Sequence, residues 1–550
     1  MSLLLPAAVL LPLLLALLRA VGLGTAGRAW LLVLAPLPLL LLALLPSGRL
    51  ELPHLLLGMS LANHGLGQVL ALLAGLAWLL AGRVAAATVT RRRRLFDAAW
   101  LGSLGGLAWA TLAGDLIGFY SGYALMTVSA YGLVIHAGTA EALRAGRVYL
   151  VMAILAEGAV LAGVLLVAAA TGALELDGLV QAPVDAGPLA GWLLLAGFGV
   201  KMGLAGLHLW LPVAHPVAPV PASAVLSGVI VKAGLLGLVR LLPEAMVPAA
   251  APCVLLGLGL FTAFYGVAMG LPQTRAKTVL AYSTVSQMGL LAMLAGLALL
   301  PGGREALWPV LGLLVLHHGL NKAALFLAAG QGRLVGAWPR LLFALPALAL
   351  AAAPLGSGML AKGALKAALA SGGYGAAWLL ALSLGSAATA LLLWRAFGLL
   401  ADAGEVRQRR SWVAWAVLVA LGAVVPWGWA LAQGLGGWPG PSTLWDGLWP
   451  LVLAAAGLWC WRRLGRPGAG WAGRVPEGDL LGPVERGLAA LRGAVARRLP
   501  GGAGLQPPAV SEWLAGAMGR GERGLAGFAA AGLAVLLLVL AAGWLLRAWA

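Results

Sequence analysis

Residues 191–212 read GWLLLAGFGVKMGLAGLHLWLP, and this stretch decides the fold. An uncharged apolar run leads directly into Lys201, and Gly203 and Gly206 then interrupt the helical pattern before Pro212. A lysine at the centre of a bilayer costs about 2.5–3.5 kcal/mol on insertion scales, so a lysine retained there indicates a function. Backbone that leaves the helix at that depth is tolerated only where it is buried in protein or lines a wet cavity.

The rest of the chain has the composition of a membrane protein. Of its 550 residues 62% are hydrophobic and only 10% are charged, whereas soluble domains carry about 25% charged residues. The net charge of +18 comes from arginines in short runs between apolar segments, which is the pattern of membrane topology. We therefore expect contact with membrane lipid and no nucleic-acid partner.

Apolar runs between glycine, proline and charged breaks give the helix count. A hydrocarbon core about 30 Å thick needs roughly 20 apolar residues per helical span, and the chain holds about sixteen such runs. The first, Leu3 to Leu18, has no basic residue before it, so we interpret it as a retained helix and not as a cleaved signal. The sequence thus predicts an all-α polytopic membrane protein.

Charges between the predicted helices alternate in sign along the chain. Odd-numbered connections carry Arg19 and Arg28, Arg91 to Arg94, Arg144 and Arg147, Arg275 and Lys277, Arg333 and Arg340, and Arg407, Arg409 and Arg410. Even-numbered connections carry Glu51, Asp115, Glu175, Asp177, Asp185, Glu244, Glu305 and Asp446. By the positive-inside rule the odd connections are cytoplasmic and both termini lie on the opposite side of the inner membrane.

The connection 463–525 differs from the others because prolines interrupt it repeatedly. Apolar residues recur within it at helical spacing: Val484, Leu488, Leu491, Val495 and Leu499. This pattern predicts a short helix on the cytoplasmic membrane surface or against a partner subunit. A merely solvated linker is the alternative. A last membrane helix follows over residues 526–550.

All six lysines fall between residues 201 and 366, against thirty arginines spread over the chain. Lys201, Lys232 and Lys362 lie inside or beside apolar runs. A lysine can take up and release a proton, which arginine practically never does. We therefore expect these three lysines to form a proton relay. Lys277 and Lys366 are better explained as lysines that extend to the membrane interface.

A histidine pair lies in the same helix as the remaining lysine. His317, His318 and Lys322 share one predicted membrane helix. Adjacent histidines point to different faces of a helix, so we expect only one of them to join the relay.

Neither a metal site nor a cofactor site is indicated by the sequence. No HxxxH, HExxH or carboxylate cluster is present, and nothing resembles a flavin, nicotinamide or iron–sulfur motif. Cys253 and Cys460 both lie in apolar runs and are most simply thiols that fill the core. We expect no catalysis by the chain alone, although it could be a subunit of a proton-pumping oxidoreductase.

A second interrupted helix corresponds to the first. It contains Pro354, Gly356 and Gly358 and leads to Lys362. Paired breaks in two halves of a membrane protein indicate inverted repeats with the conduction site between them. The predicted parts are helices 1–3 in 1–96, a first repeat (helices 4–8) in 97–245, a second repeat (helices 9–13) in 246–402, helices 14–15 in 403–462, the interrupted segment 463–525 and the last helix in 526–550.

Several motifs in this order resemble the antiporter-like subunits of respiratory complex I, Mrp-type cation/proton antiporters and membrane-bound hydrogenases. They are Lys201 with His208-Leu-Trp-Leu-Pro212, Pro219-Val-Pro-Ala-Ser-Ala224 leading to Lys232-Ala-Gly234, Lys277-Thr-Val-Leu-Ala-Tyr-Ser-Thr-Val-Ser-Gln287, His318-Gly-Leu-Asn-Lys-Ala-Ala-Leu-Phe326, and Pro354 to Lys362. The resemblance implies a fourteen-helix core with broken helices 7 and 12. It also implies a hydrated axis through Lys201, Lys232, His318 or Lys322, and Lys362.

The sequence departs from that family at a residue the family uses. Relatives carry a glutamate in helix 5 that pairs with the helix 7 lysine, in a Trp-Glu-Leu-Met motif, where this chain reads Tyr123-Ala-Leu-Met126. Either Glu157 in helix 6 substitutes for it or the coupling switch is lost. Arg275 stands where an aspartate is common, and Asn63 stands about where relatives carry an acidic residue.

The leading hypothesis is a proton-translocating subunit of a multisubunit membrane complex, moving H⁺ along a buried lysine, histidine and water relay. The coupled partner could be a redox module, Na⁺/H⁺ exchange or a proton-driven inorganic-carbon uptake system. The alternatives are a structural, non-conducting subunit and a stand-alone secondary transporter of an organic solute. The scarcity of other polar residues at the helix breaks counts against the transporter.

Overall fold

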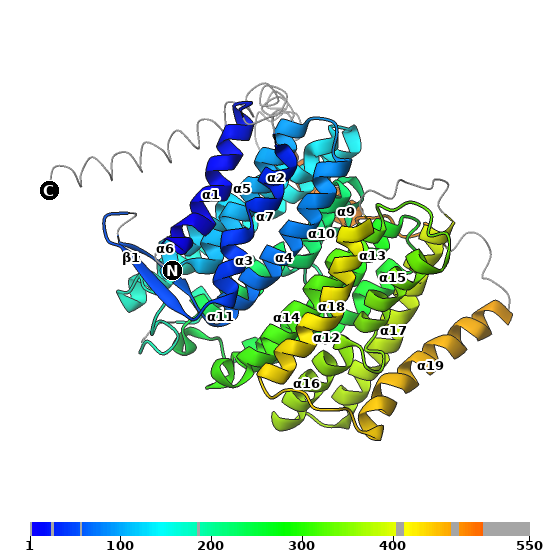
Figure 1. The fold of residues 1–550 in the computed structure, drawn as a ribbon. Coiled ribbons are helices and arrows are strands. Elements are labelled where there is room, and N and C mark those ends of the chain that lie inside the picture. The colour runs from blue at the N-terminus through cyan, green and yellow to red at the C-terminus, as the bar shows by residue number, and fades with distance from the viewer. Residues whose placement is uncertain are drawn as a thin grey trace.

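The computed structural model describes residues 3–23, 27–55, 58–183, 187–402, 412–463 and 472–498 and arranges them as one bundle of roughly aligned helices (Figure 1). The first half contains α1 Leu4–Ala20, α2 Arg28–Leu34, α3 Leu37–Leu44, β1 Gly48–Leu52, β2 Met59–Asn63, α4 Gly65–Thr88, α5 Arg93–Leu112, α6 Leu116–Val134, η1 Ile135–Ala137, α7 Ala140–Thr171, α8 Leu189–Met202, α9 Trp210–Val217, α10 Val220–Val225, η2 Leu226–Ile230, α11 Lys232–Leu241 and η3 Glu244–Met246.

The second half is helical throughout its described part. It contains α12 Ala251–Gly270, α13 Ala276–Ala298, α14 Gly303–Ala328, α15 Ala337–Leu350, α16 Ser357–Ser371, α17 Ala376–Ala401, α18 Trp412–Ala432, α19 Pro441–Arg463 and α20 Leu481–Arg498. Nine helices in the described residues are long and apolar enough to cross a membrane. The count of about sixteen spans therefore stays a prediction, and its last member, 526–550, lies outside the described residues.

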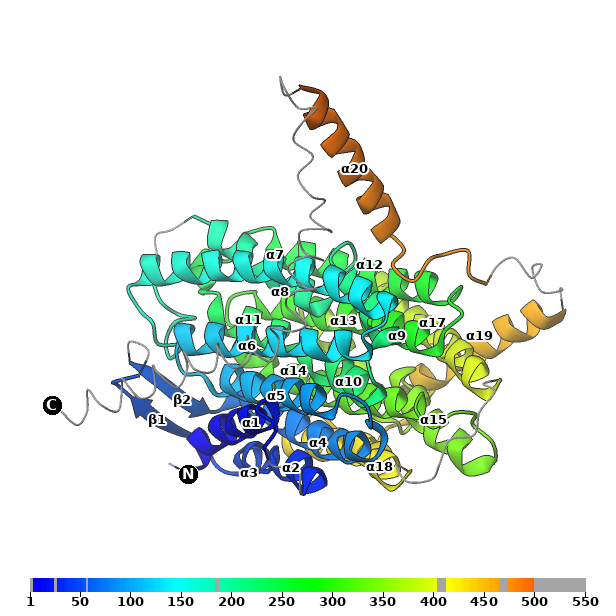
Figure 2. The ribbon, with the colours of Figure 1, turned by 90° about the horizontal axis from the view of Figure 1, so that it is seen from above.

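The helical fold class is confirmed, with one short addition. Strands β1 and β2 form an antiparallel hairpin in which Leu50 pairs with Leu61, at one end of the bundle (Figure 2). The sequence analysis missed the hairpin because it assigned this stretch, with Glu51, to a connection between two helices. Leu61 also bridges to Ala113, so the hairpin joins the first helices to the end of α5.

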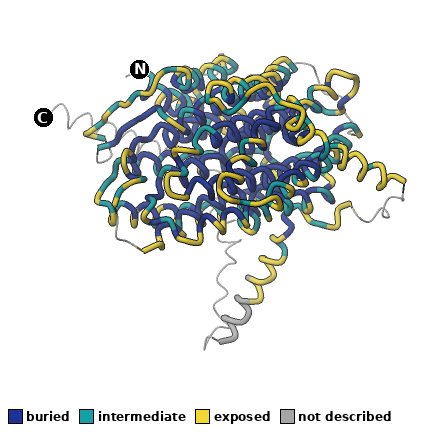
Figure 3. The backbone as a smooth tube through the Cα atoms, turned by 90° about the horizontal axis from the view of Figure 1, so that it is seen from below, coloured by how far each residue is buried: buried dark blue, intermediate teal, exposed yellow. Residues whose placement is uncertain are grey.

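The helices that carry the central lysines lie at the middle of the bundle. The apolar windows of α10–α11, α13 and α14 are 100% buried, against 33% for α7 and 17% for α19. Figure 3 shows the same gradient from a buried interior to exposed outer helices. Charged groups on the central helices are thus enclosed by protein and not by lipid.

Small residues let α12 and α13 pack closely. A Cβ at Gly266 would lie 2.6 Å from the Ser286 nitrogen, and one at Gly289 would lie 2.4 Å from the Gly259 oxygen. Such backbone approach is typical of membrane helices, which associate by close packing. It fixes α13, which contributes Thr284 and the Leu280 carbonyl to the site described below.

The prediction that the cysteines fill the core is wrong. Cys253 on α12 and Cys460 on α19 are both exposed. An apolar run in a membrane helix has a lipid-facing side as well as a core-facing side, and its composition does not separate the two.

Contacts between connections sort them into two ends of the bundle. At one end Asp97 pairs with Arg19 and Arg28, and Arg275 pairs with Glu141. At the other end Glu51, Glu175 and Asp177 all pair with Arg49. We call these the arginine-rich and carboxylate-rich ends. This grouping agrees with the alternation in the sequence; which end is cytoplasmic stays a prediction.

The segment after α19 contains the helix that the apolar stripe predicts. Helix α20 extends away from the bundle (Figure 2), and near its start Glu485 pairs with Arg144. Residues 472–480, which precede α20, do not extend away but pack back into the bundle.

Candidate functional site

The first predicted helix break lies between α8 and α9. Gly203 ends α8 with a φ of 73°, a left-handed conformation that favours glycine. The amide nitrogens of Gly203 and Leu204 both donate to the Gly199 carbonyl, which closes the helix end as C-capping motifs do. Met202 is the last helical residue, so Lys201 lies directly at the break.

Lys201 is buried, with 4% of its surface exposed. Its Nζ donates to the Thr127 hydroxyl on α6 and lies 4.9 Å from the centroid of the Tyr123 ring. The Tyr149 hydroxyl in turn donates to the Thr127 carbonyl at 3.1 Å. The lysine therefore faces helices α6 and α7, the same direction in which a helix 5 glutamate was expected.

Glu157, the carboxylate that the sequence analysis offered as a substitute for the missing glutamate, lies on α7. It interacts electrostatically with Lys201 and is a hydrogen-bond neighbour of Thr127. The residue is half-buried, and its Oε1 is buried without a hydrogen-bond partner. Ala124 is also half-buried but has no group to offer a lysine. The carboxylate thus acts on Lys201 electrostatically, from the neighbouring helix, without forming an ion pair with it in this structure.

Lys232 and Lys322 occupy the centre of the bundle and are linked by hydrogen bonds. Lys232 Nζ donates to the Ser227 carbonyl at 2.7 Å, and the Ser227 and Thr284 hydroxyls lie 2.7 Å apart. Thr284 and Lys322 both donate to the Leu280 carbonyl, at 3.1 Å each. Two lysines from different helices thus share one chain of polar groups.

A π-helical turn precedes Lys232. Residues Leu226–Ile230 form the π-helical segment η2, a distortion that is frequent at functional sites. It places the Ser227 carbonyl within reach of Lys232 Nζ. The sequence analysis did not predict this turn, since no proline or glycine pair signals it.

His317 and His318 are both buried, at 3% and 2% exposure, and their rings face different neighbours. The His317 Nδ1 lies 2.9 Å from the Ser357 hydroxyl at the start of α16. Both ring nitrogens of His318 are buried and have no hydrogen-bond partner among the residues that the structure describes, and its electrostatic neighbours include Lys232 and Lys322. One histidine faces the second break and the other the central lysines, so both adjoin the predicted lysines.

The second predicted break separates α15 from α16. Ala352 and Leu355 have φ values of 61° and 62°, and a Cβ at Gly358 would lie 1.8 Å from the Ala349 carbonyl oxygen. Only glycine allows α16 to cross the end of α15 this closely. Lys362, 6% exposed, follows on α16 and donates to the Ser386 hydroxyl at 2.9 Å.

The two lysines expected to lie outside the relay have other partners. Lys277 Nζ donates to the carbonyls of Pro216 and Ala218, which ties the start of α13 to the α9–α10 connection. Lys366 pairs with Asp446 at 3.0 Å in an exposed ion pair. Neither is in hydrogen-bond contact with another lysine.

One group beside the first break was missed by the sequence analysis. The strap, residues 472–480, runs from the arginine-rich end into the bundle and brings Asp479 to His208. The Asp479 Oδ2 lies 3.2 Å from His208 Nε2 and also accepts from the Tyr265 hydroxyl. Burial raises the pKa of Asp479, but hydrogen bonds from His208 and Tyr265 outweigh it and hold that pKa below its ordinary value. Nothing in the sequence indicates that Asp479 contacts His208, 271 positions away.

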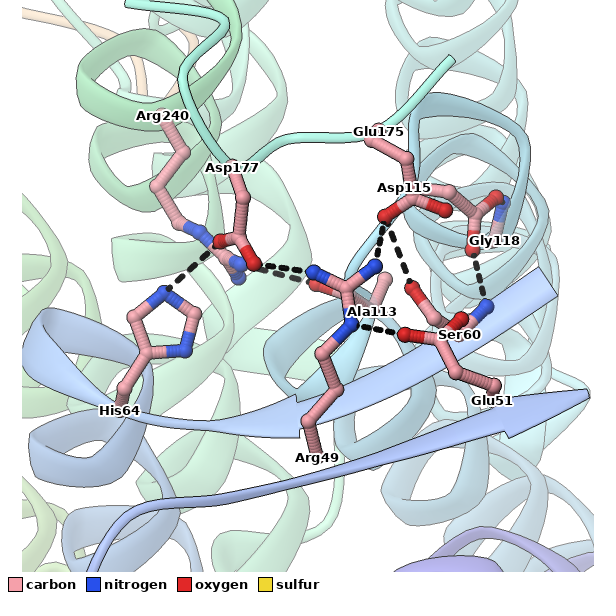
Figure 4. A network of polar contacts seen from close by, with 10 residues as sticks. All are labelled: Arg49, Glu51, Ser60, His64, Ala113, Asp115, Gly118, Glu175, Asp177 and Arg240. Atoms are coloured by element: carbon pink, nitrogen blue, oxygen red, sulfur yellow. Dashed lines mark hydrogen bonds and ion pairs between the residues drawn. The ribbon is translucent and has the colours of Figure 1, made fainter.

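A polar network closes the carboxylate-rich end (Figure 4). Arg49 on β1 contacts three carboxylates there, and Ser60 donates to Glu175 at 3.2 Å. The Asp115 carboxylate accepts from the backbone of Ser60 and Gly118. Burial raises the pKa of Asp115, and these two hydrogen bonds oppose the shift. The network fastens the hairpin to the helix ends.

Comparison with known proteins places this site in a recognised domain. A family described as NADH:quinone oxidoreductase/Mrp antiporter, transmembrane, matches residues 113–336. Hydrogenase-4 component B of Escherichia coli is 32% identical over 220 residues, 38% of this chain and 33% of that protein. NADH-quinone oxidoreductase subunit M of Pseudomonas aeruginosa is 30% identical over 330 residues, 54% and 62% respectively. The chain thus spans less than two thirds of each relative.

Solved structures extend the likeness over more of the fold. A chain of the archaeal membrane-bound sulfane sulfur reductase superposes with a TM-score of 0.68 at 20% identity, covering 82% of this chain and 98% of that chain. A chain of the Mrp complex from Dietzia sp. gives 0.64 at 21% identity, with coverages of 84% and 100%. At these identities the likeness shows the fold.

The matched residues include both ends of α8–α9, the π-helical turn and the histidine pair. The first break, Lys201, Lys232 and Lys322 therefore lie within the matched residues, whereas the second break and Lys362 follow them. Residues 113–336 match the NADH:quinone oxidoreductase/Mrp antiporter transmembrane family, and the chain is a multi-pass membrane protein that shares the fold of the Mrp-complex chain.

Proposed function

We propose that this chain is the proton-translocating subunit of a multisubunit membrane complex. The observation that carries the proposal is the set of buried lysines and histidines on α8, α11, α14 and α16. Lys201, Lys232, Lys322 and Lys362, with His317 and His318, are each at most 6% exposed. Buried ionisable groups in membrane helices mark ion and proton pathways.

Hydrogen-bonded groups lie between some members of this set. Ser227, Thr284 and the Leu280 carbonyl join Lys232 to Lys322. The unpartnered nitrogens of His318 face this pair and can bond to water, which bridges polar groups in buried sites. His317 and Ser357 extend these contacts to α16, where Lys362 lies.

Glu157 takes the part of the helix 5 glutamate in this proposal. A carboxylate beside a lysine favours its charged form, and moving the two apart releases the proton. The electrostatic influence of Glu157 on Lys201, which bonds to Thr127, supports such a pair formed from α7. A non-conducting subunit would have no use for it.

Partners and placement follow from the relatives. Their names are those of components of respiratory, hydrogenase and antiporter complexes, so we propose further membrane subunits as partners and H⁺ as the ion, with Na⁺ exchange or inorganic-carbon uptake as other couplings. Exposed leucines and isoleucines on α7, such as Ile154 and Leu155, fit contact with lipid. We place the arginine-rich end in the cytoplasm.

The test is proton flux through the intact complex in vesicles. Lys232→Arg keeps the positive charge, but a guanidinium does not give up its proton as a lysine can. Flux should therefore fall at least about a hundredfold, within the range for lost proton transfer. Lys366→Gln, the matched lysine control in the exposed pair with Asp446, should leave flux within about twofold, as expected for a surface ion pair.

Equal flux in Lys232→Arg and unmodified complex, with both assembled, would establish the alternative: a structural subunit that no longer conducts.

A further inference from the structure

The strap is held in the bundle by contacts along its whole length. Gly473 donates to the Pro272 carbonyl at 2.7 Å, and Gln273 donates to the Val475 carbonyl at 3.3 Å. The Tyr282 hydroxyl donates to the Glu477 carbonyl at 3.0 Å. These contacts fix the strap against the α12–α13 connection at the arginine-rich end.

The strap carries two carboxylates at different depths. The Glu477 side chain is 28% exposed and pairs with Arg275, while its Oε1 accepts from the Thr278 hydroxyl at 2.8 Å. The Asp479 side chain is 3% exposed, and its partner His208 is fully buried. The two acids thus lead from the surface to the first helix break.

His208 has one ring nitrogen free to continue that path. Its Nε2 faces Asp479, and its Nδ1 is buried without a hydrogen-bond partner among the described residues. A buried polar atom without a partner is costly unless water or a transient group satisfies it. His208 lies in the α8–α9 connection, within seven positions of Lys201 in the chain.

We propose that Asp479 is a proton-transfer residue that passes protons between the arginine-rich surface and His208. A proton on the Asp479 carboxyl moves to Nε2 of neutral His208, which leaves the carboxylate and an imidazolium. The imidazolium then releases the proton bound to Nδ1 toward the first break, which leaves the Nε2–H tautomer. Loss of the Nε2 proton to water and uptake of a proton from water at Nδ1 restore the starting tautomer. The inference rests on the proposed function and adds an entrance to it.

Several charged or titratable groups face this entrance and shape its response to pH. They are Tyr265 from α12, Arg275, Lys277 and Tyr282 from α13, Glu141 from α7, and Glu477 from the strap. The Tyr265 hydroxyl stabilises the carboxylate form of Asp479. Arg275 neutralises the outer acids, so an arriving proton meets Asp479 as the first buried base.

The test compares proton flux in the intact complex. Asp479→Asn keeps the size and the hydrogen-bond acceptor but cannot bind a proton, so flux should fall at least about tenfold. Asp479→Glu should recover most of it. Glu485→Gln, on the same tail in the exposed pair with Arg144, is the matched control and should stay within about twofold.

A crosslink between the strap and the bundle tests whether Asp479 transfers protons or only holds the strap in position. Gln273→Cys and Val475→Cys, with Cys253 and Cys460 changed to serine, would join residues already in contact. With the strap locked, Asp479→Asn should still conduct poorly, and its flux should lose dependence on pH at the arginine-rich side. Recovery of flux on crosslinking would show a positioning role and overturn the proposal.

Two other outcomes overturn it as well. Unchanged flux in Asp479→Asn would remove Asp479 from the path, and increased flux would show that the strap is a plug. Lys232→Arg in the same preparation tells the two proposals apart. If Lys232→Arg abolishes flux while Asp479→Asn does not, only the entrance fails; if neither matters, proton translocation itself fails.

Discussion

The two broken helices hold their lysines in opposite ways. Lys201 lies just before its break, with the Thr127 hydroxyl, the Tyr123 ring and the Glu157 carboxylate around it. Lys362 lies just after its break and bonds to the Ser386 hydroxyl. Its electrostatic neighbours include Lys366 and His317, which are basic.

Under the proposed function, the difference would give Lys201 and Lys362 different tasks. A lysine with a carboxylate beside it can hold its proton until the pair separates, which makes it a switch. A lysine with only a hydroxyl for a partner releases its proton more readily, because nothing compensates the charge. Similar backbone breaks thus support a control point at Lys201 and a transfer point at Lys362.

Among the variants that test this comparison, the largest effect should come from removing the carboxylate beside Lys201. Glu157→Gln should lower coupled proton flux at least about tenfold, since the lysine loses its counter-charge. Adding Ala124→Glu to that variant returns a carboxylate from α6 and should restore flux. Flux through vesicles measures both. If the double variant stays as slow as Glu157→Gln, the two positions are not equivalent.

Which of these features the sequence could predict depends on how local they are. The two helix breaks could be predicted from Lys201, Gly203 and Pro354, because a charged residue or a helix breaker within an apolar run is recognisable in the sequence. The sequence left open whether Glu157 acts on Lys201, since the answer depends on how α7 packs on α6.

Features made by distant contacts could not be predicted. The strap comes from a proline-rich segment that the sequence analysis interpreted as a surface connection, yet Asp479 reaches His208. The exposure of Cys253 likewise depends on which side of α12 meets the bundle. Three-dimensional packing, and not propensity, determines both.

A smaller effect should follow from making the second site resemble the first. Ser386→Asp places a carboxylate next to Lys362 Nζ, which would hold the proton in an ion pair and slow its release. We expect flux to fall several-fold while the complex still assembles. Ser386→Asn, similar in size and uncharged, is the control. Equal rates in both variants would mean that charge at this site does not limit transfer.

A weaker effect is expected from the hydroxyl at the first site. Thr127→Val keeps the side-chain shape but removes the group between Lys201 and Glu157. Because the two charges can still meet directly, flux should fall less than in Glu157→Gln. Measuring both variants in one vesicle preparation tests that order. A larger loss in Thr127→Val would assign the switch to the hydroxyl.

The smallest effect concerns the carboxylate-rich end, which lies away from both lysines. Arg49→Gln removes the centre of the network in Figure 4, but its groups are partly exposed. We expect a loss of less than about 1 kcal/mol in stability and no change in flux. Thermal unfolding in detergent checks the first and vesicle assays the second. A drop in flux would extend the pathway to this network.

The enclosure of α14 has a consequence for how the protein is made. The side of α14 that holds His317 and Asn321 is covered by α18, where Gly422 accepts from Asn321 and the Trp415 indole donates to the Ala324 carbonyl. Roughly ninety residues separate these partners. During synthesis α14 therefore enters the membrane before its cover exists. The growing chain must shelter this polar face with an insertion factor, another subunit or water until α18 arrives.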